Sequence, residues 1–463
     1  MKFLYIILSF QLKAILSTCV LLITSFHIVD AQQPSKLHVQ DEKYFFQFQP
    51  LEQISYKICA SQDFQTWKHL ASVRGTGSFD WLLPDSELLL ARRFYRAESV
   101  AAIGSEHLTG WQSFKLAEAG KYRIGLIGDS YTHARTRYSL RLKQMLAAEY
   151  GDLGAGYLSF GFHTSAGYNG SVDNEEFNYS LIKTEWIPTY GNGYGPDACH
   201  VTSAVVRAAI TVRILKTVDS IQLRYVNQVG SGGFRYRINS GAWVSVATDA
   251  ELGLGNHEIT LGNIVAPYEI EIEALAAGVT LMGVEAVKSG DGVVVHKLAV
   301  SGGRALVFAT NDLAKTSTAS LQLDMAVIMF GTNEHLGNQA PWSFRQGLVN
   351  IVQTLRSSNP SIDLVFALPC YTKYELENPR AYNLQDYGAV MRSVAEEYQG
   401  AYIDFTEVFG PADQLQNLVD AGLMSSDRIH PTTSYAGEGC GGYLIANTIY
   451  KSVLGCNSSV YWE

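Results

Sequence analysis

One stretch constrains the fold more than any other: an apolar run that stops at a tight turn and continues as a helix. Residues 122–133 read Tyr-Arg-Ile-Gly-Leu-Ile-Gly-Asp-Ser-Tyr-Thr-His, and apolar residues at near-helical spacing follow up to Gly151. A buried strand leading directly into a helix is typical of open α/β sheets, whose reactive groups collect at the carboxyl edge beside helix N-termini. The pattern therefore makes Ser130 a candidate nucleophile at such an edge.

Composition, charge and cysteine spacing limit the domain number and the possible partners. The chain has 463 residues, 47% of them hydrophobic and 17% charged, so two or three folded domains are expected. A net charge of −9 and the lack of a basic cluster argue against a nucleic-acid partner. The cysteines show no metal-type spacing, so a zinc site is not predicted. In an oxidising compartment, Cys440 and Cys456 could form a disulfide across the last helical segment.

The N-terminus has the pattern of a secretory signal peptide, predicted over residues 1–31. Lys2 and Lys13 are followed by an apolar stretch from Ala14 to Val29, and the sequence Val29-Asp30-Ala31 at its end suits signal peptidase. A retained membrane anchor is the alternative. The mature chain is predicted to have no membrane span and to be secreted, periplasmic or on the cell surface.

Hydrophobic periodicity divides the remaining chain into distinct parts. Residues 34–100 alternate in short apolar stretches, which predicts a small all-β module, a sandwich with a spacer, binding or docking role. Residues 118–196 and 291–463 alternate strands with helices, which predicts one α/β domain whose parallel sheet is covered on both faces. Residues 197–290 lose the helical period and predict a second β-sandwich inserted into that domain. Before it, the Tyr- and Gly-rich stretch 157–196 is expected to form loops.

Three downstream stretches can complete a hydrolytic site around Ser130. In Asp427-Arg-Ile-His430, the histidine can accept the serine proton and the carboxylate can fix its tautomer, although a surface pair is the alternative. Asn333, which follows an apolar run ending at Phe330, can donate its amide to an oxyanion or simply cap a turn. A glycine N–H in Val300-Ser-Gly-Gly303 can approach the same oxyanion.

Taken in order, these motifs resemble the blocks of the SGNH (GDSL-like) hydrolase superfamily. The four blocks are Gly128-Asp-Ser130, Ser301-Gly302, Gly331-Thr-Asn333 and Asp427-x-x-His430. The resemblance covers roughly residues 120–195 and 290–463, and it implies a flavodoxin-like, three-layer α/β domain and a serine esterase without a cofactor. It implies that Ser130 is the nucleophile, His430 the base and Asp427 its orienter. The oxyanion hole would combine the N–H groups of Ser130 and Gly302 with the Asn333 side chain.

Further features resemble one subgroup, the secreted carbohydrate O-acetylesterases. This subgroup includes peptidoglycan O-acetylesterases and carries a carbohydrate-binding-type jelly roll inserted after the first block. The shared features are the inserted β-domain, the Thr-Asn-Glu form of the third block and the stretch Tyr150-Gly-Asp-Leu-Gly-Ala-Gly-Tyr157. Two positions depart from the usual pattern of the superfamily. Glu334 replaces the more usual acid of the third block, and Tyr131 replaces the usual Leu or His after the nucleophile.

The resemblance implies an exported serine esterase that removes O-acetyl groups from an acetylated polysaccharide or glycan. A lipolytic or general carboxylesterase is one alternative, and the lack of a long apolar loop near the motifs argues against it. A non-catalytic glycan-binding protein is the other, and the intact set Ser130, Asp427 and His430 argues against it.

Overall fold

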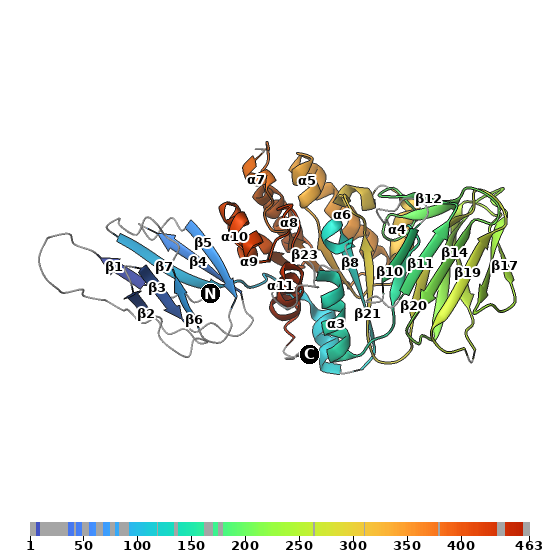
Figure 1. Cartoon of the computed structure of the whole chain (residues 1–463), viewed down its shortest axis with the longest axis horizontal. Coiled ribbons are helices and arrows are strands. Elements are labelled where there is room, and N and C mark those ends of the chain that lie inside the picture. The colour runs from blue at the N-terminus through green and yellow to red at the C-terminus, as the bar shows by residue number, and fades with distance from the viewer. Residues whose placement is uncertain are drawn as a thin grey trace, which may run out of the picture.

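Three regions follow one another along the longest axis of the computed structural model: N-terminal β-sheets, a central α/β region and two large antiparallel sheets (Figure 1). The structure describes residues 6–9, 36–40, 43–48, 55–61, 68–74, 79–82, 92–117, 119–133, 138–161, 170–174, 179–262, 264–309, 311–377, 380–432 and 440–456.

The central region is built on a five-stranded parallel sheet with the order β21-β8-β22-β23-β24. Its strands are β8 (Lys121–Gly128), β21 (Gly292–Ala299), β22 (Met325–Met329), β23 (Asp363–Leu368) and β24 (Ala401–Asp404). Numbered along the chain, this order is 2-1-3-4-5, the flavodoxin-like arrangement. The predicted α/β fold with a parallel sheet is confirmed.

Helices cover both faces of this sheet, because its strands are apolar on both sides. Alternate residues of β22 point into different cores: Val327 packs with α3 and α11, whereas Ile328 packs with α6 and α8. Those helices are α3 (Tyr138–Tyr150), α6 (Pro341–Ser358), α8 (Leu384–Glu397) and α11 (Gly441–Thr448). Pro341 suits the first turn of α6, where its missing N–H has no partner to lose.

Two antiparallel sheets interrupt the α/β region between β8 and β21. One has the order β10-β11-β14-β19-β16-β17, and the other β12-β13-β20-β15-β18 with β9 added to β20. Ile210 and Ile272 from the first sheet share one apolar core with Leu223 and Val284 from the second, so the two sheets pack face to face. The strands are β9 (Gly156–Ser159), β10 (Gly170–Asn174), β11 (Tyr179–Thr184), β12 (Trp186–Thr189), β13 (His200–Ser203), β14 (Ala209–Ile214), β15 (Ser220–Asn227), β16 (Gly233–Ile238), β17 (Val244–Ala247), β18 (Gly253–Ile259), β19 (Tyr268–Ala274) and β20 (Thr280–Val287).

These sheets begin earlier in the chain than the boundary at residue 197. Four of their strands lie within residues 156–189, where the sequence predicted loops. The first of them, β9, pairs with β20 and also lies along β21, where the Tyr157 amide donates to Nδ1 of His296 over 3.2 Å. The first strand after α3 therefore already links the inserted antiparallel sheets to the parallel sheet.

The N-terminal strands form a sheet of order β1-β7-β4-β5 and a second of order β2-β3-β6, with antiparallel pairing throughout. Within the predicted signal peptide the structure describes Ile6–Ser9, which pairs with β7. The hydroxyl of Ser72 in β5 donates to the carbonyl of Glu407 in α9 (Phe405–Phe409), so β5 contacts the central region. The strands are β1 (Ile6–Ser9), β2 (Lys36–Gln40), β3 (Lys43–Phe48), β4 (Ser55–Ser61), β5 (Lys68–Arg74), β6 (Phe79–Leu82) and β7 (Arg92–Ser99).

Cys440 and Cys456 lie near the two ends of the final helical segment and are buried free thiols, so the disulfide considered between them is not formed. None of the helices in the described part of the chain is both long and apolar enough to cross a membrane.

Candidate active site

Ser130 lies where the chain passes from β8 into α2 (Ser130–His133). Position 128, in the turn before Ser130, requires glycine, because a Cβ there would lie 2.3 Å from Oγ1 of Thr132 and 2.7 Å from the carbonyl oxygen of Met329. Gly128 thus lets the first turn of α2 fold back tightly against β8 and β22. The serine is half-buried at the carboxyl edge of the sheet, at the point where the strand order reverses.

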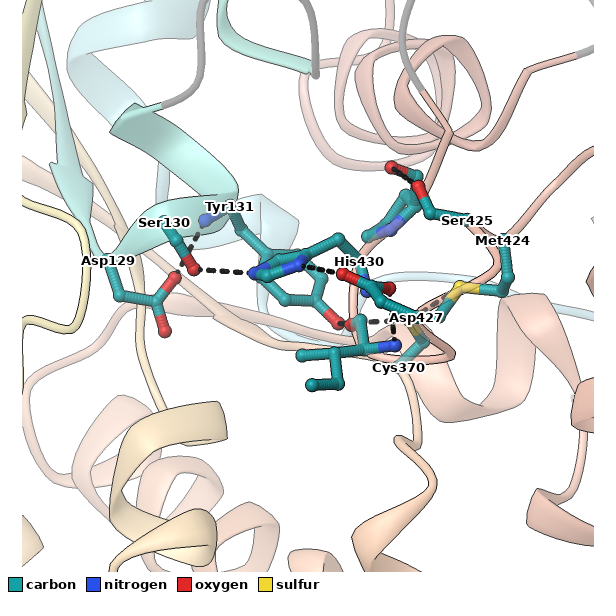
Figure 2. Close-up of polar contacts among 10 residues, drawn as sticks. Asp129, Ser130, Tyr131, Cys370, Met424, Ser425, Asp427 and His430 are labelled. Atoms are coloured by element: carbon teal, nitrogen blue, oxygen red, sulfur yellow. Dashed lines mark hydrogen bonds and ion pairs between the residues drawn. The ribbon is translucent and has the colours of Figure 1, made fainter. Parts of the chain in front are cut away.

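The structure brings Ser130, His430 and Asp427 into one row (Figure 2). Oγ of Ser130 lies 3.0 Å from Nε2 of His430, and Nδ1 of the same imidazole lies 2.7 Å from Oδ2 of Asp427. These are the distances required for proton transfer from a hydroxyl to an imidazole whose other nitrogen is held by a carboxylate.

Asp427 is held in its ionised form by the turn to which it belongs. Its Oδ1 accepts hydrogen bonds from the amides of Ile429 over 2.8 Å and His430 over 3.0 Å. Partial burial acts to raise the pKa of Asp427, but the hydrogen bonds from the His430 amide and imidazole and from the Ile429 amide outweigh it and lower that pKa. The carboxylate is thus charged at neutral pH and fixes the orientation of the imidazole.

Two of the three predicted oxyanion donors lie beyond the ends of β21 and β22, the strands on either side of β8. Gly302 is exposed in the turn after β21, with a φ of 74° that favours glycine. Asn333, in α5 (Thr332–Leu336), donates its side-chain amide to Oδ2 of Asp129 and to the carbonyl of Gly303, both over 3.0 Å. Asn333 therefore links the nucleophile motif to the Gly302 turn.

Two carboxylates that the sequence analysis did not assign to the site fix its loops. Asp129 is fully buried and accepts from the Tyr131 amide over 2.9 Å as well as from Asn333. Glu334 is also fully buried and accepts from the amides of Ala305 over 2.7 Å and Gly331 over 3.0 Å. In the sequence, these two residues are marked by their positions in the motifs, where Asp129 precedes Ser130 and Glu334 follows Asn333.

The carboxyl group of Glu334 has a raised pKa. Burial raises its pKa to about 7, against the lowering effect of the hydrogen bonds from the backbone amides. Because the same carboxyl group holds the loop after β21 and the loop after β22, it fixes the turn of Gly302 relative to Asn333.

His133, the last residue of α2, contacts the loop after β21. Nδ1 of His133 lies 3.2 Å from Oγ of Ser301, the residue before Gly302.

Within the described ranges, no group of three or more His, Cys, Asp or Glu side chains has a geometry that could hold a metal ion.

Comparisons with known proteins agree with the motifs. Residues 279–434 match the model of the GDSL-like Lipase/Acylhydrolase family, a segment that contains Gly302, Asn333, Asp427 and His430 but not Ser130. No curated protein matches the chain in sequence. The predicted resemblance to the GDSL-like hydrolases is confirmed.

A solved structure described as "Peptidoglycan O-acetylesterase in action, 5 min" shares the fold: it superposes with a TM-score of 0.59 and 15% identity, covering 75% of this chain and 95% of that chain. An active-site mutant of a family two carbohydrate esterase from Clostridium thermocellum, in complex with celluohexase, has 10% identity over 60% of this chain and 99% of that chain. Its TM-score is 0.27.

Proposed function

We propose that the chain is an exported serine esterase that removes O-acetyl groups from a polysaccharide or glycan. The observation that carries this proposal is the row Ser130–His430–Asp427 at the carboxyl edge of the parallel sheet, with 3.0 Å and 2.7 Å between the interacting atoms. A serine, an imidazole and a carboxylate in this order are the parts of an acyl-transfer site.

In the first step, Ser130 attacks the carbonyl carbon of the acetyl ester while its proton passes to Nε2 of His430. Asp427 stabilises the imidazolium that forms, because hydrogen bonds in its own turn keep the carboxylate charged. Negative charge develops on the former carbonyl oxygen. Its donors are the amides of Ser130 and Gly302 and the side chain of Asn333.

In the second step, the tetrahedral intermediate collapses and the bond to the sugar oxygen breaks. The leaving alkoxide takes the proton from Nε2 of His430, and the acetyl group remains on Ser130. Water then gives a proton to His430 and attacks the acyl-enzyme, and the collapse of this second intermediate releases acetate and returns the proton to Oγ of Ser130.

Asn333 has a double role in this mechanism. Its amide hydrogens are directed to Asp129 and to the Gly303 carbonyl, so the side chain first positions the Gly302 turn. The charged oxyanion is a stronger acceptor than a neutral carbonyl, and it draws one of these hydrogens toward itself as charge develops.

The parts outside the α/β region receive supporting roles. The two face-to-face sheets between β8 and β21 are a jelly-roll-like, carbohydrate-binding insert that contacts the polymer. The N-terminal strands are a small sandwich that acts as a spacer or docking module, and residues 1–31 direct export. The insertion of the sheets between the strand of Ser130 and the strand of Gly302 supports a role close to the site.

The test is acetate release by the mature chain from acetylated peptidoglycan, xylan, pectin and algal glycans, together with a series of p-nitrophenyl esters of increasing acyl length. We expect release from at least one glycan, a preference for acetyl over longer acyl groups, and loss of both activities in Ser130→Ala. Ser357→Ala, at the exposed end of α6, is the matched control. A preference for long acyl chains would instead indicate a lipolytic enzyme, and no release with no phosphonate labelling would indicate a binding protein.

A further inference from the structure

The side chain directly after the nucleophile points toward the turn that carries His430. Tyr131 is fully buried, and its ring lies beside the imidazole of His430, with 5.8 Å between the ring centroids (Figure 2). Its hydroxyl reaches the carbonyl of Ile429 over 2.5 Å and lies 3.4 Å from Sγ of Cys370. The first residue of α2 thus contacts the side chain of the base, and the second contacts the backbone that carries it.

The contacted carbonyl belongs to the peptide bond between Ile429 and His430. The N–H of that same peptide donates to Oδ1 of Asp427 over 3.0 Å, while its C=O accepts from Tyr131. Because the peptide group is planar, holding both of its polar ends fixes its plane and hence the direction in which the His430 side chain leaves the backbone.

The turn that carries the base needs such support. Arg428, in its middle, has a φ of 54°, a left-handed conformation that is unfavourable for a residue with a side chain. Such residues keep this conformation where surrounding contacts hold it. Here the Lys373 amide donates to the Arg428 carbonyl over 2.9 Å, and the Ser425 amide donates to the His430 carbonyl over 2.8 Å.

We propose that Tyr131 is a positioning residue that sets the distance between Ser130 and His430 by binding the Ile429 carbonyl. The Ser130–His430 hydrogen bond must break and form again in each half of the reaction, because its proton moves. The Tyr131–Ile429 bond takes no part in that transfer, so it keeps α2 and the turn in register throughout both steps. This inference rests on the proposed esterase function.

The test compares Tyr131→Phe with Tyr138→Phe. Tyr138 is also fully buried, and its hydroxyl lies 2.8 Å from Oγ1 of Thr132 in α2, so the control removes an equivalent hydroxyl beside the same helix but away from the turn. With p-nitrophenyl acetate, we expect kcat to fall about 10- to 100-fold in Tyr131→Phe with KM within about twofold of wild type, since a small misplacement of catalytic groups costs up to about 100-fold. Tyr138→Phe should stay within about twofold of wild type.

Labelling by a serine-directed phosphonate separates positioning from folding. We expect Tyr131→Phe to reach the same final stoichiometry as wild type, one label per chain, at a rate lowered by a similar factor. A lower stoichiometry with an unchanged rate would show that Tyr131 only supports folding, and equal slowing in Tyr138→Phe would show a general effect on α2. Either result would overturn the proposal.

The same data distinguish this inference from the proposed function. If wild type is labelled at Ser130 and hydrolyses the ester while Tyr131→Phe behaves like wild type, the positioning role alone fails. If wild type is neither labelled nor active, the esterase function fails, and the positioning role fails with it.

Discussion

The edge of the parallel sheet and the contact between that sheet and the inserted sheets both bury carboxylates, but with different partners. At the edge, Asp129 and Glu334 accept hydrogen bonds from backbone amides and an asparagine. At the contact, Glu285 of β20 lies between two guanidinium groups, Arg224 of β15 in its own sheet and Arg123 of β8 in the parallel sheet. A carboxylate among amides fixes the shape of loops, whereas one between arginines fixes two sheets relative to each other.

This difference predicts that substitutions at the edge impair chemistry and substitutions at the contact impair stability. Both kinds of carboxylate are buried, so burial alone does not tell them apart. The hydrogen-bond partners distinguish them. A backbone amide cannot move away from its acceptor without a change in the loop. The arginine side chains have further acceptors, the Leu321 carbonyl for Arg123 and the Ser320 hydroxyl for Arg224.

The largest expected effect follows the substitution Asp427→Asn. The amide preserves the shape of the turn but presents a donor to Nδ1 of His430, which favours the wrong imidazole tautomer, and we expect kcat to fall about 10⁴-fold. The measurement is acetate release under saturating substrate, with Asp413→Asn, an exposed aspartate, as control. A loss of less than about tenfold would mean that Asp427 does not orient the base.

A smaller loss is expected for Glu334→Gln. A glutamine has one acceptor oxygen, so it leaves the amide of either Ala305 or Gly331 without its partner, and we expect the free energy of unfolding to fall by about 1–3 kcal/mol. The loop carrying Gly302 loosens with it, and kcat should fall about tenfold, since an oxyanion donor that is removed outright costs about 100-fold or more. Glu396→Gln, on the exposed side of α8, is the control. Wild-type activity in Glu334→Gln would show that this buried carboxyl group does not shape the catalytic loops.

Glu334 also predicts a pH dependence of stability. Its folded-state pKa of about 7 lies above the ordinary value of 4.5, so between those values the folded chain holds a proton that the unfolded chain has lost. The contribution of Glu334 to the free energy of unfolding is therefore greatest below about pH 4.5 and falls as the pH rises to about 7. Denaturant unfolding across this window should show the fall in wild type and lack that component in Glu334→Gln.

At the contact, Arg224→Met should reverse the pattern. Arg224 is only 3% exposed. Its loss leaves Glu285 with Arg123 as the remaining charged partner, and a hydrogen bond to a charged group contributes about 1.5–3 kcal/mol. We expect the free energy of unfolding to fall by about that amount while kcat for p-nitrophenyl acetate stays within about twofold. The control is Arg213→Met, an exposed arginine in β14. A large loss in kcat without a loss in stability would show that the contact also shapes the site.

The sequence predicted the edge better than the contact, for a physical reason. Strand, turn and helix around Ser130 are local patterns, and the catalytic groups come in short motifs whose chemistry is visible in the residue types. The role of Tyr131 depends on a partner 298 positions away, and that of Glu285 on Arg123, 162 positions away, so neither leaves a local pattern. The strands within residues 156–189 were missed because Tyr- and Gly-rich sequence resembles loop sequence when its pairing strands are not known.

The smallest effect is expected on the outer face of the inserted sheets, where arginine–glutamate pairs are half-exposed. Nε and Nη2 of Arg235 lie 3.0 Å and 2.6 Å from Oε2 of Glu273, and the guanidinium stacks 4.4 Å from the ring centroid of Trp243. Because water screens such a pair, a double-mutant cycle of Arg235→Met and Glu273→Gln should give a coupling of about 0.2–1 kcal/mol in the free energy of unfolding. A coupling as large as the loss in Arg224→Met would show that the charge of the partner, and not its burial, sets the strength of these pairs.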